Sequence, residues 1–419
     1  MQTTLADFIK GTPEGDEAEA ILRACVHCGF CTATCPTYQL LGDELDGPRG
    51  RIYLIKQVLE GAPVTASTQL HLDRCLTCRS CESTCPSGVK YGRLADIGRK
   101  VVEQRVPRRL PERIKRYVLK EALPRQWLFN PALRVGQLLR PLLSRPLQDK
   151  VPPRRAATVW PVREHARSML VLDGCVQPGL APNINAAAAR VLDTLGVQLL
   201  AAPGAGCCGA LRFHLNDQAA ALDDMRRNID AWWPLVARAE AIVMTASGCG
   251  VTVKEYGHLL AHDPAYAEKA ARISAMTRDL SEILPAFEAE LARRVYARRA
   301  GGTGAGAGEP VAWHPPCTLQ HGQQIRGKVE GLLRAIGVEV RLCRDAHLCC
   351  GSAGTYSLLQ PELSQQLRER KLAALADTGA ARIVSANIGC QGHLQSGTAT
   401  PVEHWIELVD RALHARPGD

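Results

Sequence analysis

The sequence predicts a multidomain chain of mixed α+β and α/β class. A helical N-terminal domain is expected first, followed by a duplicated α/β domain with parallel sheets. Three observations predict this. The 419 residues are enough for two to three domains. Two cysteine runs recur at a constant offset near the N-terminus. Strands and helices alternate in the C-terminal half, where a second cysteine pattern recurs.

The two N-terminal cysteine runs share the spacing C-x2-C-x2-C-x3-C-P, and corresponding cysteines lie 50 residues apart. The first run is Cys25, Cys28, Cys31 and Cys35, and the second is Cys75, Cys78, Cys81 and Cys85. The stretch between them predicts a helix over residues 48–61. We assign residues 1–104 to this domain.

This spacing is typical of ferredoxin-like domains that hold two [4Fe–4S] clusters. Three closely spaced thiolates wrap one side of a cluster, and the last cysteine of each run serves the other cluster. We therefore assign Cys25, Cys28, Cys31 and Cys85 to cluster 1, and Cys75, Cys78, Cys81 and Cys35 to cluster 2. The alternative, a pair of zinc sites, fits poorly because zinc sites use paired C-x2-4-C knuckles.

The cysteine count also bears on the compartment. Seventeen cysteines is an odd number, and the N-terminal residues lack the basic and apolar regions of a secretory signal. No run of 18 apolar residues predicts a spanning helix. We expect a cytoplasmic protein, or a peripheral one on the cytosolic face of the inner membrane. Metal ligation or thiol chemistry is then favoured over disulfides.

Residues 105–167 predict a basic helical linker. Between residues 105 and 155 there are 14 Lys and Arg against 3 Asp and Glu. Apolar residues at helical spacing predict a helix near residues 110–118, and prolines from position 124 onward are expected to break the rest of the segment into short pieces. Apolar residues 127–129 among the charges favour an anionic lipid surface or an acidic partner over a solvated face. No motif or aromatic platform favours nucleic acid.

The C-terminal half predicts two α/β repeats, at 168–299 and 311–419, joined by a glycine-rich linker at 300–310. The strands are expected at 169–175, 197–203, 241–247, 311–317, 338–343 and 382–389, and the helices at 182–196, 325–337 and 361–379. Each repeat carries the pattern C-x31-C-C-G followed by a lone cysteine. These cysteines are Cys175, Cys207, Cys208 and Cys249 in the first copy, and Cys317, Cys349, Cys350 and Cys390 in the second.

The cysteines of the repeats are expected at strand ends or in the following loops, where parallel sheets build sites. Three interpretations remain open. Each copy holds a further cluster, one site forms between the copies, or the cysteines are structural or a dithiol redox pair. Cys343 is expected to be a buried apolar cysteine. Four histidines near the second set either bind iron or relay protons, or form ordinary loop hydrogen bonds. They are His314, His321, His347 and His393.

Two ferredoxin runs followed by two CCG repeats resemble the iron–sulfur subunits of bacterial glycolate oxidase over nearly the whole chain. The segments that carry the resemblance include ILRACVHCGFCTATCPTYQLLGDELDGPRGRIYLIKQVLEG, HLDRCLTCRSCESTCPSGV, NIDAWWP, TASGCG, HLCCGSAGTY and ANIGCQGH. The ferredoxin runs occur in many iron–sulfur proteins, whereas the segments around residues 230–234 and Cys249 resemble the glycolate oxidase subunits specifically.

The resemblance implies an electron-transfer subunit. Electrons would come from a partner FAD subunit that oxidises glycolate to glyoxylate and pass towards quinone or a membrane acceptor. The chain has no flavin, nicotinamide or phosphate-loop fingerprint of its own, so it is not expected to oxidise the organic substrate alone. One alternative is the equivalent subunit of a lactate or glycerol-3-phosphate dehydrogenase. The other is a heterodisulfide-reductase-like thiol/disulfide enzyme, which Ala246 and Asn387 disfavour because they replace cysteines of that family's pattern.

Overall fold

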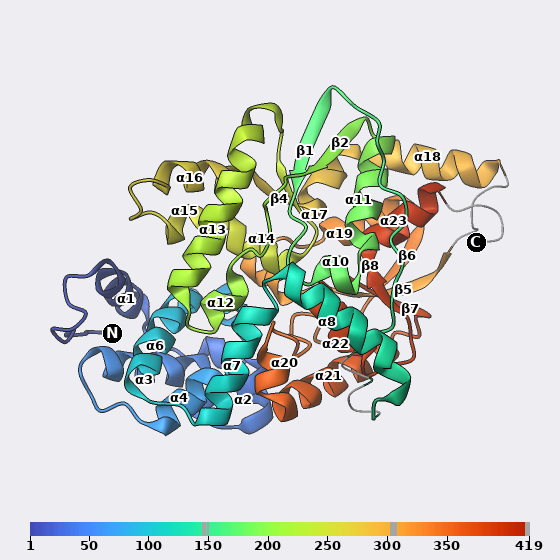
Figure 1. Ribbon diagram of the computed structural model, residues 1–419. Helices are drawn as coiled ribbons and strands as arrows, with labels where there is room; N and C mark the ends of the chain where they lie inside the picture. The colour runs from blue at the N-terminus through green and yellow to red at the C-terminus, as the bar shows by residue number, and fades with distance from the viewer. Residues whose placement is uncertain (145–147, 149–150, 302–307, 415–419) are drawn as a thin grey trace.

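The computed structural model describes residues 1–144, 148, 151–301 and 308–414. Figure 1 shows an N-terminal helical region in blue, a first α/β unit in green and yellow, and a second in orange and red. The predicted fold class is confirmed, because the helical region precedes two units that each contain a parallel sheet.

The N-terminal region is built from short helices around the two cysteine runs. They are α1 (Pro13–Ala24), η1 (Phe30–Thr32), α2 (Pro36–Leu41), η2 (Glu44–Asp46), α3 (Pro48–Leu59), α4 (Ala66–Asp73), α5 (Ser80–Thr84) and α6 (Tyr91–Arg105). Helix α3 is the helix predicted over 48–61. The apolar faces of α1, α3 and α6 pack together through residues such as Leu22, Ile55 and Leu94. Helices α1 and α4 end just before the two cysteine runs, so this core holds both runs in place.

The basic segment forms α7 (Leu110–Ala122), α8 (Gln126–Leu139) and η3 (Arg140–Leu142). The break at Pro124 is found, but the expected break at Pro131 is wrong, because α8 continues through it. Proline removes the hydrogen bond to the carbonyl four residues earlier. Here that residue is Trp127, and α8 has no buried residue, so the loss does not fall in a core. Residue 146 lies outside the described residues.

Within the described part of the chain, no helix combines the length and apolarity needed to cross a membrane.

Each α/β unit contains a four-stranded sheet in which all neighbouring strands are parallel. The first sheet has the order β2 (Val197–Ala201), β1 (Arg167–Val171), β3 (Ile242–Met244), β4 (Thr277–Asp279). The second has the order β6 (Val338–Leu342), β5 (Gly308–His314), β7 (Arg382–Ser385), β8 (Val402–His404). Strands β4 and β8 were not predicted because their three residues include charged side chains, TRD in β4 and VEH in β8, whereas the equally short β3 lies in a longer apolar run.

The glycine-rich stretch is shorter than the predicted 300–310. Helix α18 (Glu288–Ala300) runs up to it, and β5 already begins at Gly308. Residues 302–307 lie outside the described residues.

Helices cover both faces of the sheets. The longer ones are α11 (Asn183–Thr194), α13 (Gln218–Trp232), α14 (Ser247–Lys254), α16 (Ala267–Met276), α19 (Lys328–Ala335), α21 (Pro361–Ala376), α22 (Ile388–Gln395) and α23 (Trp405–His414). Side chains alternate along β1. Met169 and Val171 face a core shared by both units with α11, α19 and α23, whereas Leu170 packs on the opposite face with α13 and α16.

Polar contacts join the units around the ends of the strands. His404 Nε2 lies 2.8 Å from the carbonyl oxygen of Thr245 across the two copies. The N-terminal region contacts both copies. Arg79 Nη1 pairs with Glu255 of the first copy at 2.6 Å, and Tyr356 of the second copy donates to the carbonyl of Arg74 at 3.1 Å. The N-terminal cysteines therefore lie beside the carboxyl ends of the sheets.

Candidate metal centres

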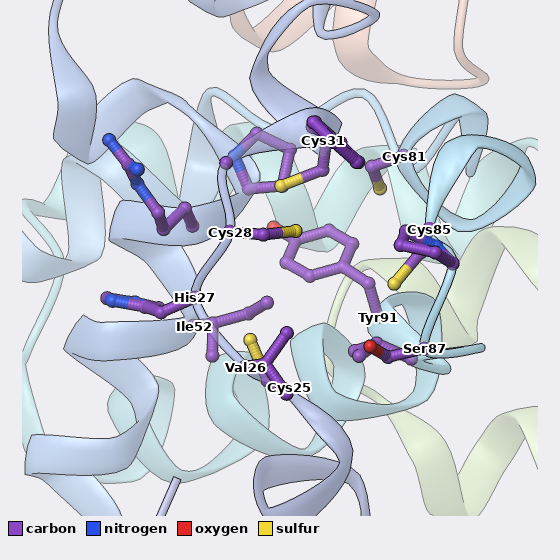
Figure 2. Close-up of a pocket in the computed structure, with 16 residues that line it drawn as sticks. Cys25, Val26, His27, Cys28, Cys31, Ile52, Cys81, Cys85, Ser87 and Tyr91 are labelled. Atoms are coloured by element: carbon purple, nitrogen blue, oxygen red, sulfur yellow. The ribbon is translucent and has the colours of Figure 1, made fainter.

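The first hollow in the N-terminal region is lined by cysteines of both runs. Cys25, Cys28 and Cys31 come from the segment between α1 and α2, and Cys85 follows α5. Figure 2 shows their sulfur atoms around a shared space, with the Tyr91 ring behind it. These are the four residues that the spacing groups as cluster 1.

The second hollow is lined by Cys35, Cys75, Cys78 and Cys81, the four residues grouped as cluster 2. Cys81 also borders the first hollow, which places the two hollows side by side. Each run thus sends its last cysteine to the hollow of the other run. Two hollows that each gather four thiols from both runs fit a pair of four-iron clusters.

The backbone of the two runs repeats as the sequence does. His27 and Gly29 in the first run have φ angles of 60° and 86°, and Thr77 and Arg79 at the equivalent positions have φ angles of 53° and 59°. A left-handed residue reverses the chain locally. Pairs of such residues between the cysteines let three closely spaced side chains turn towards one point.

Two buried cations lie beside the second hollow. Arg51 is 1% exposed and hydrogen-bonds to the His71 carbonyl at 2.7 Å and to Thr37 at 3.1 Å. Arg99 donates to the carbonyl of Cys75 at 2.6 Å and to Thr77 at 2.9 Å. Their positive charges can stabilise thiolates and any additional negative charge at this site.

The thiols of the two hollows respond differently to these charges. Burial raises the pKa of Cys31 to about 11, and the neighbouring Cys25 adds to this effect. Burial also raises the pKa of Cys75, but Arg51 and Arg99 outweigh it, and the pKa lies below its ordinary value. Tyr91 donates to Cys75 Sγ at 3.5 Å and supports the same thiolate. This effect is confined to Cys75, because burial raises the pKa of Cys78 and of Cys81 in the same hollow well above its ordinary value.

In the first copy, the four cysteines form one group. Cys207 contacts Cys175 and Cys208, and Cys208 contacts Cys249. Hydrogen bonds from Cys175 and Cys208 outweigh burial and, with the charge of Arg227, hold the pKa of Cys207 well below its ordinary value. A thiolate is thus favoured at the centre of the group.

In the second copy, Cys317 and Cys349 have their sulfur atoms 3.8 Å apart, and Cys350 contacts both Cys349 and Cys390. Both sets therefore assemble within their own copy, not between copies. The second set also adjoins the N-terminal region, because Cys78 packs with Cys317 and Cys349.

The expected placement of these cysteines at strand ends needs correction. Strands β1 and β5 end at Val171 and His314, several residues before Cys175 and Cys317. The left-handed Gly174 turns the chain in the first copy, and Pro315 and Pro316, which lack an N–H for the ladder, do so in the second. Cys249 and Cys390 lie in the first turns of α14 and α22, not in loops.

The four histidines near the second set have different surroundings, and burial lowers the pKa of His347. His321 lies 2.9 Å from Ser83 and 2.8 Å from the His347 carbonyl, and His393 lies 3.2 Å from Ser364 Oγ. Hydrogen bonding accounts for these two rings. Burial lowers the pKa of His314 well below its usual range, so its imidazole is neutral.

Sequence reasoning missed the residues that surround the ligands. Arg51 lies on the buried face of α3 with Ile52 and Ile55. A charged residue on such an apolar face could have been recognised in the sequence as a candidate functional residue. His314 could also have been found from the sequence. The offset of 142 residues that relates the two cysteine sets aligns it with Leu172, so a histidine replaces an apolar residue of the first copy. Nothing in the cysteine spacing points to Arg99.

Comparisons with known proteins agree with this arrangement. A 4Fe-4S dicluster domain matches residues 21–89, and a cysteine-rich domain matches residues 169–254 and 311–395. The glycolate oxidase iron-sulfur subunit of Escherichia coli (strain K12) is 54% identical over 99% of both chains. The probable glycolate oxidase iron-sulfur subunit of Bacillus subtilis (strain 168) is 30% identical, covering 91% of this chain and 90% of that protein.

A more distant relative matches only part of the chain. Lactate utilization protein A of Bacillus licheniformis is 27% identical over 52% of this chain and 85% of its own length. The glycolate oxidase subunits, in contrast, match across both the dicluster region and the duplicated unit. The chain therefore belongs to the family of glycolate oxidase iron–sulfur subunits.

Proposed function

We propose that this chain is the electron-transfer subunit of a glycolate-oxidising complex. It would receive electrons from a partner FAD subunit that converts glycolate to glyoxylate and deliver them to quinone. The observation that carries the proposal is the pair of adjoining hollows, in which the last cysteine of each run lines the hollow of the other run and Cys81 borders both. Two glycolate oxidase subunits match this chain over 99% and 90% of their own length, which supports glycolate as the substrate of the complex. The lactate utilization protein matches only 52% of this chain.

Glycolate gives up two electrons and two protons when it becomes glyoxylate, and a quinone takes up the same number. When bound, [4Fe–4S] clusters supply one-electron carriers. The residues of this chain hold the clusters, set the charge around them and exclude water. The proposed ligands are Cys25, Cys28, Cys31 and Cys85 in the first hollow, and Cys75, Cys78, Cys81 and Cys35 in the second. The cysteines of the two copies are candidate metal ligands as well.

The two hollows differ in accessibility. Cys28 is exposed, and its neighbours Val26 and Phe30 are exposed apolar residues. Cys78 is instead covered by the second copy. We assign the exposed rim at Val26 and Phe30 to contact with the flavin subunit, because electron entry requires a close approach. The positive charges of Arg51 and Arg99 beside the second hollow favour electron flow inwards from this rim.

We place the exposed face of α7 and α8 on an anionic membrane surface. On α8 and η3, Trp127, Val135, Leu138 and Leu142 lie along one exposed stripe. Trp127 is 73% and Leu138 is 80% exposed. Arginines and lysines give the surrounding segment its positive charge. Apolar stripes flanked by basic residues bind in the plane of anionic bilayers, close to a lipid-dissolved quinone.

The exchanged ligands give a first test. Cys35→Ser should remove the cluster of the second hollow and so lower the iron content by about four per chain. Its electron paramagnetic resonance spectrum should match that of Cys78→Ser and differ from that of Cys28→Ser. Cys343→Ser, outside both hollows, should keep all the iron. A match between Cys35→Ser and Cys28→Ser would contradict the exchange.

Arg99→Gln should lower the reduction potential of the cluster in the second hollow by roughly tens of millivolts, because a positive charge stabilises the reduced state. Redox titration followed by paramagnetic resonance measures the shift. Arg105→Gln is the matched control, since it lies six residues further along α6, about 9 Å by helical rise. Equal shifts in both variants would exclude a local effect.

Electron entry is tested with the flavin subunit added to this chain. Glycolate should bleach the visible absorbance of the clusters only when that subunit is present. Phe30→Asp should slow this bleaching at least tenfold with unchanged iron content. Val162→Asp, at an exposed position outside the cysteine runs, should bleach normally. Glycolate oxidation by this chain alone, with a dye as acceptor, would overturn the subunit assignment.

Membrane contact predicts sedimentation with vesicles that contain phosphatidylglycerol, and weaker sedimentation with neutral vesicles or at high salt. The double variant Trp127→Ser, Leu138→Ser should lose most of this binding. Trp233→Ser, which removes a half-exposed tryptophan of the first copy, should retain it. If the double variant binds vesicles normally but no longer binds the flavin subunit, the surface serves that partner instead.

A further inference from the structure

The second copy contains a group of metal-binding side chains that goes beyond its cysteines. His314, Cys350 and Cys390 place a ring nitrogen and two sulfur atoms within 4.8 Å of one another. The three residues come from separate segments: the end of β5, the loop after β6 and the first turn of α22. They meet at the carboxyl edge of the sheet, where parallel sheets form binding sites.

His314 is buried without a hydrogen-bond partner. Its side chain is 1% exposed, and within the described part of the chain neither ring nitrogen has a donor or acceptor. Burying a polar group unpaired costs on the order of 1–3 kcal/mol. Because native proteins pair nearly all such groups, an unpaired imidazole beside two thiols indicates that something else occupies its lone pair.

The distances favour one metal ion over a cubane. A Zn²⁺ ion binds sulfur at about 2.3 Å and nitrogen at about 2.0 Å, so ligands of one tetrahedral ion lie less than about 4 Å apart. The thiolates of a four-iron cluster bind different irons and therefore lie farther apart. The limit of 4.8 Å across all three donors allows side-chain adjustment to a single ion.

Comparison of the two copies shows that this donor set is specific to the second. At the position equivalent to His314, the first copy has Leu172, which packs in an apolar core. The equivalents of Cys350 and Cys390 are still cysteines, Cys208 and Cys249. The thiols are therefore common to both copies, and the imidazole is the single addition.

We propose that His314, Cys350 and Cys390 bind one borderline divalent ion of the Zn²⁺ class, without inorganic sulfide. Cys349, which contacts Cys350, is placed to complete the coordination. Asn387 Nδ2 donates to Cys390 Sγ at 3.7 Å, a contact that orients this ligand. The buried Lys371 ammonium donates to the Asp345 carbonyl at 2.6 Å and lies near the His314 ring.

The test measures iron, zinc and acid-labile sulfide in the anaerobically purified full chain. A [4Fe–4S] cluster contributes iron and sulfide in equal amounts, so the excess of total metal over sulfide counts ions outside clusters. This excess should be about one per chain in the wild type. His314→Leu, which copies the first repeat, should reduce it to near zero and keep the cluster iron.

Two variants serve as controls. His314→Cys supplies another ligand and should retain the ion, and His393→Gln, at a hydrogen-bonded histidine of the same copy, should retain it too. An unchanged excess in His314→Leu would overturn the proposal, as would extra iron accompanied by equal sulfide. If His314→Leu fails to fold, X-ray absorption at the zinc edge of the wild type decides, since no imidazole nitrogen around the metal would refute the site.

Discussion

The N-terminal domain depends on one constraint: each cysteine run must place its last thiol in the hollow of the other. Cys35 and Cys85 can do so only if η1 and α5 pack side by side, as they do. That packing fixes where α3 and α6 cross, because both helices adjoin the runs. The buried Arg51 and Arg99 then hold the backbone around the second hollow through carbonyl hydrogen bonds. A small domain with a modest apolar core is thus organised around its two cysteine runs.

In the duplicated unit, the fold is shared between the two copies and the surroundings of the cysteines differ. Both copies keep the same strand order, and their cysteines keep the same spacing, yet their surroundings have diverged. The first copy buries Leu172 where the second buries His314. The second copy packs Cys317 and Cys349 against the N-terminal region at Cys78. Duplication therefore supplies two scaffolds of one geometry, and individual substitutions give them separate chemistry.

Much of this architecture can be predicted from the sequence because spacing is a strong signal. The constant offset of 50 residues predicts the paired runs, and periodicity predicts six of the eight strands described. Strands β4 and β8 are short and contain charged residues, so no apolar run marks them as it marks the equally short β3. Arg99 and the contact of Cys78 with the second copy arise from long-range packing, which local patterns do not encode. Helix α8 accommodates Pro131 at a position where none of its residues is buried, so the hydrogen bond that the proline removes is not lost in a core.

The second copy packs over Cys78, and this contact affects when the second hollow is accessible during biosynthesis. The ribosome makes the N-terminal region first, and domains generally fold as units in that order. The second hollow is thus more exposed while residues such as Cys349 and Leu363 are still to be made, and docking of the finished copy partly covers it at Cys78. A metal centre is therefore easier to assemble in this hollow before the second copy docks than after it.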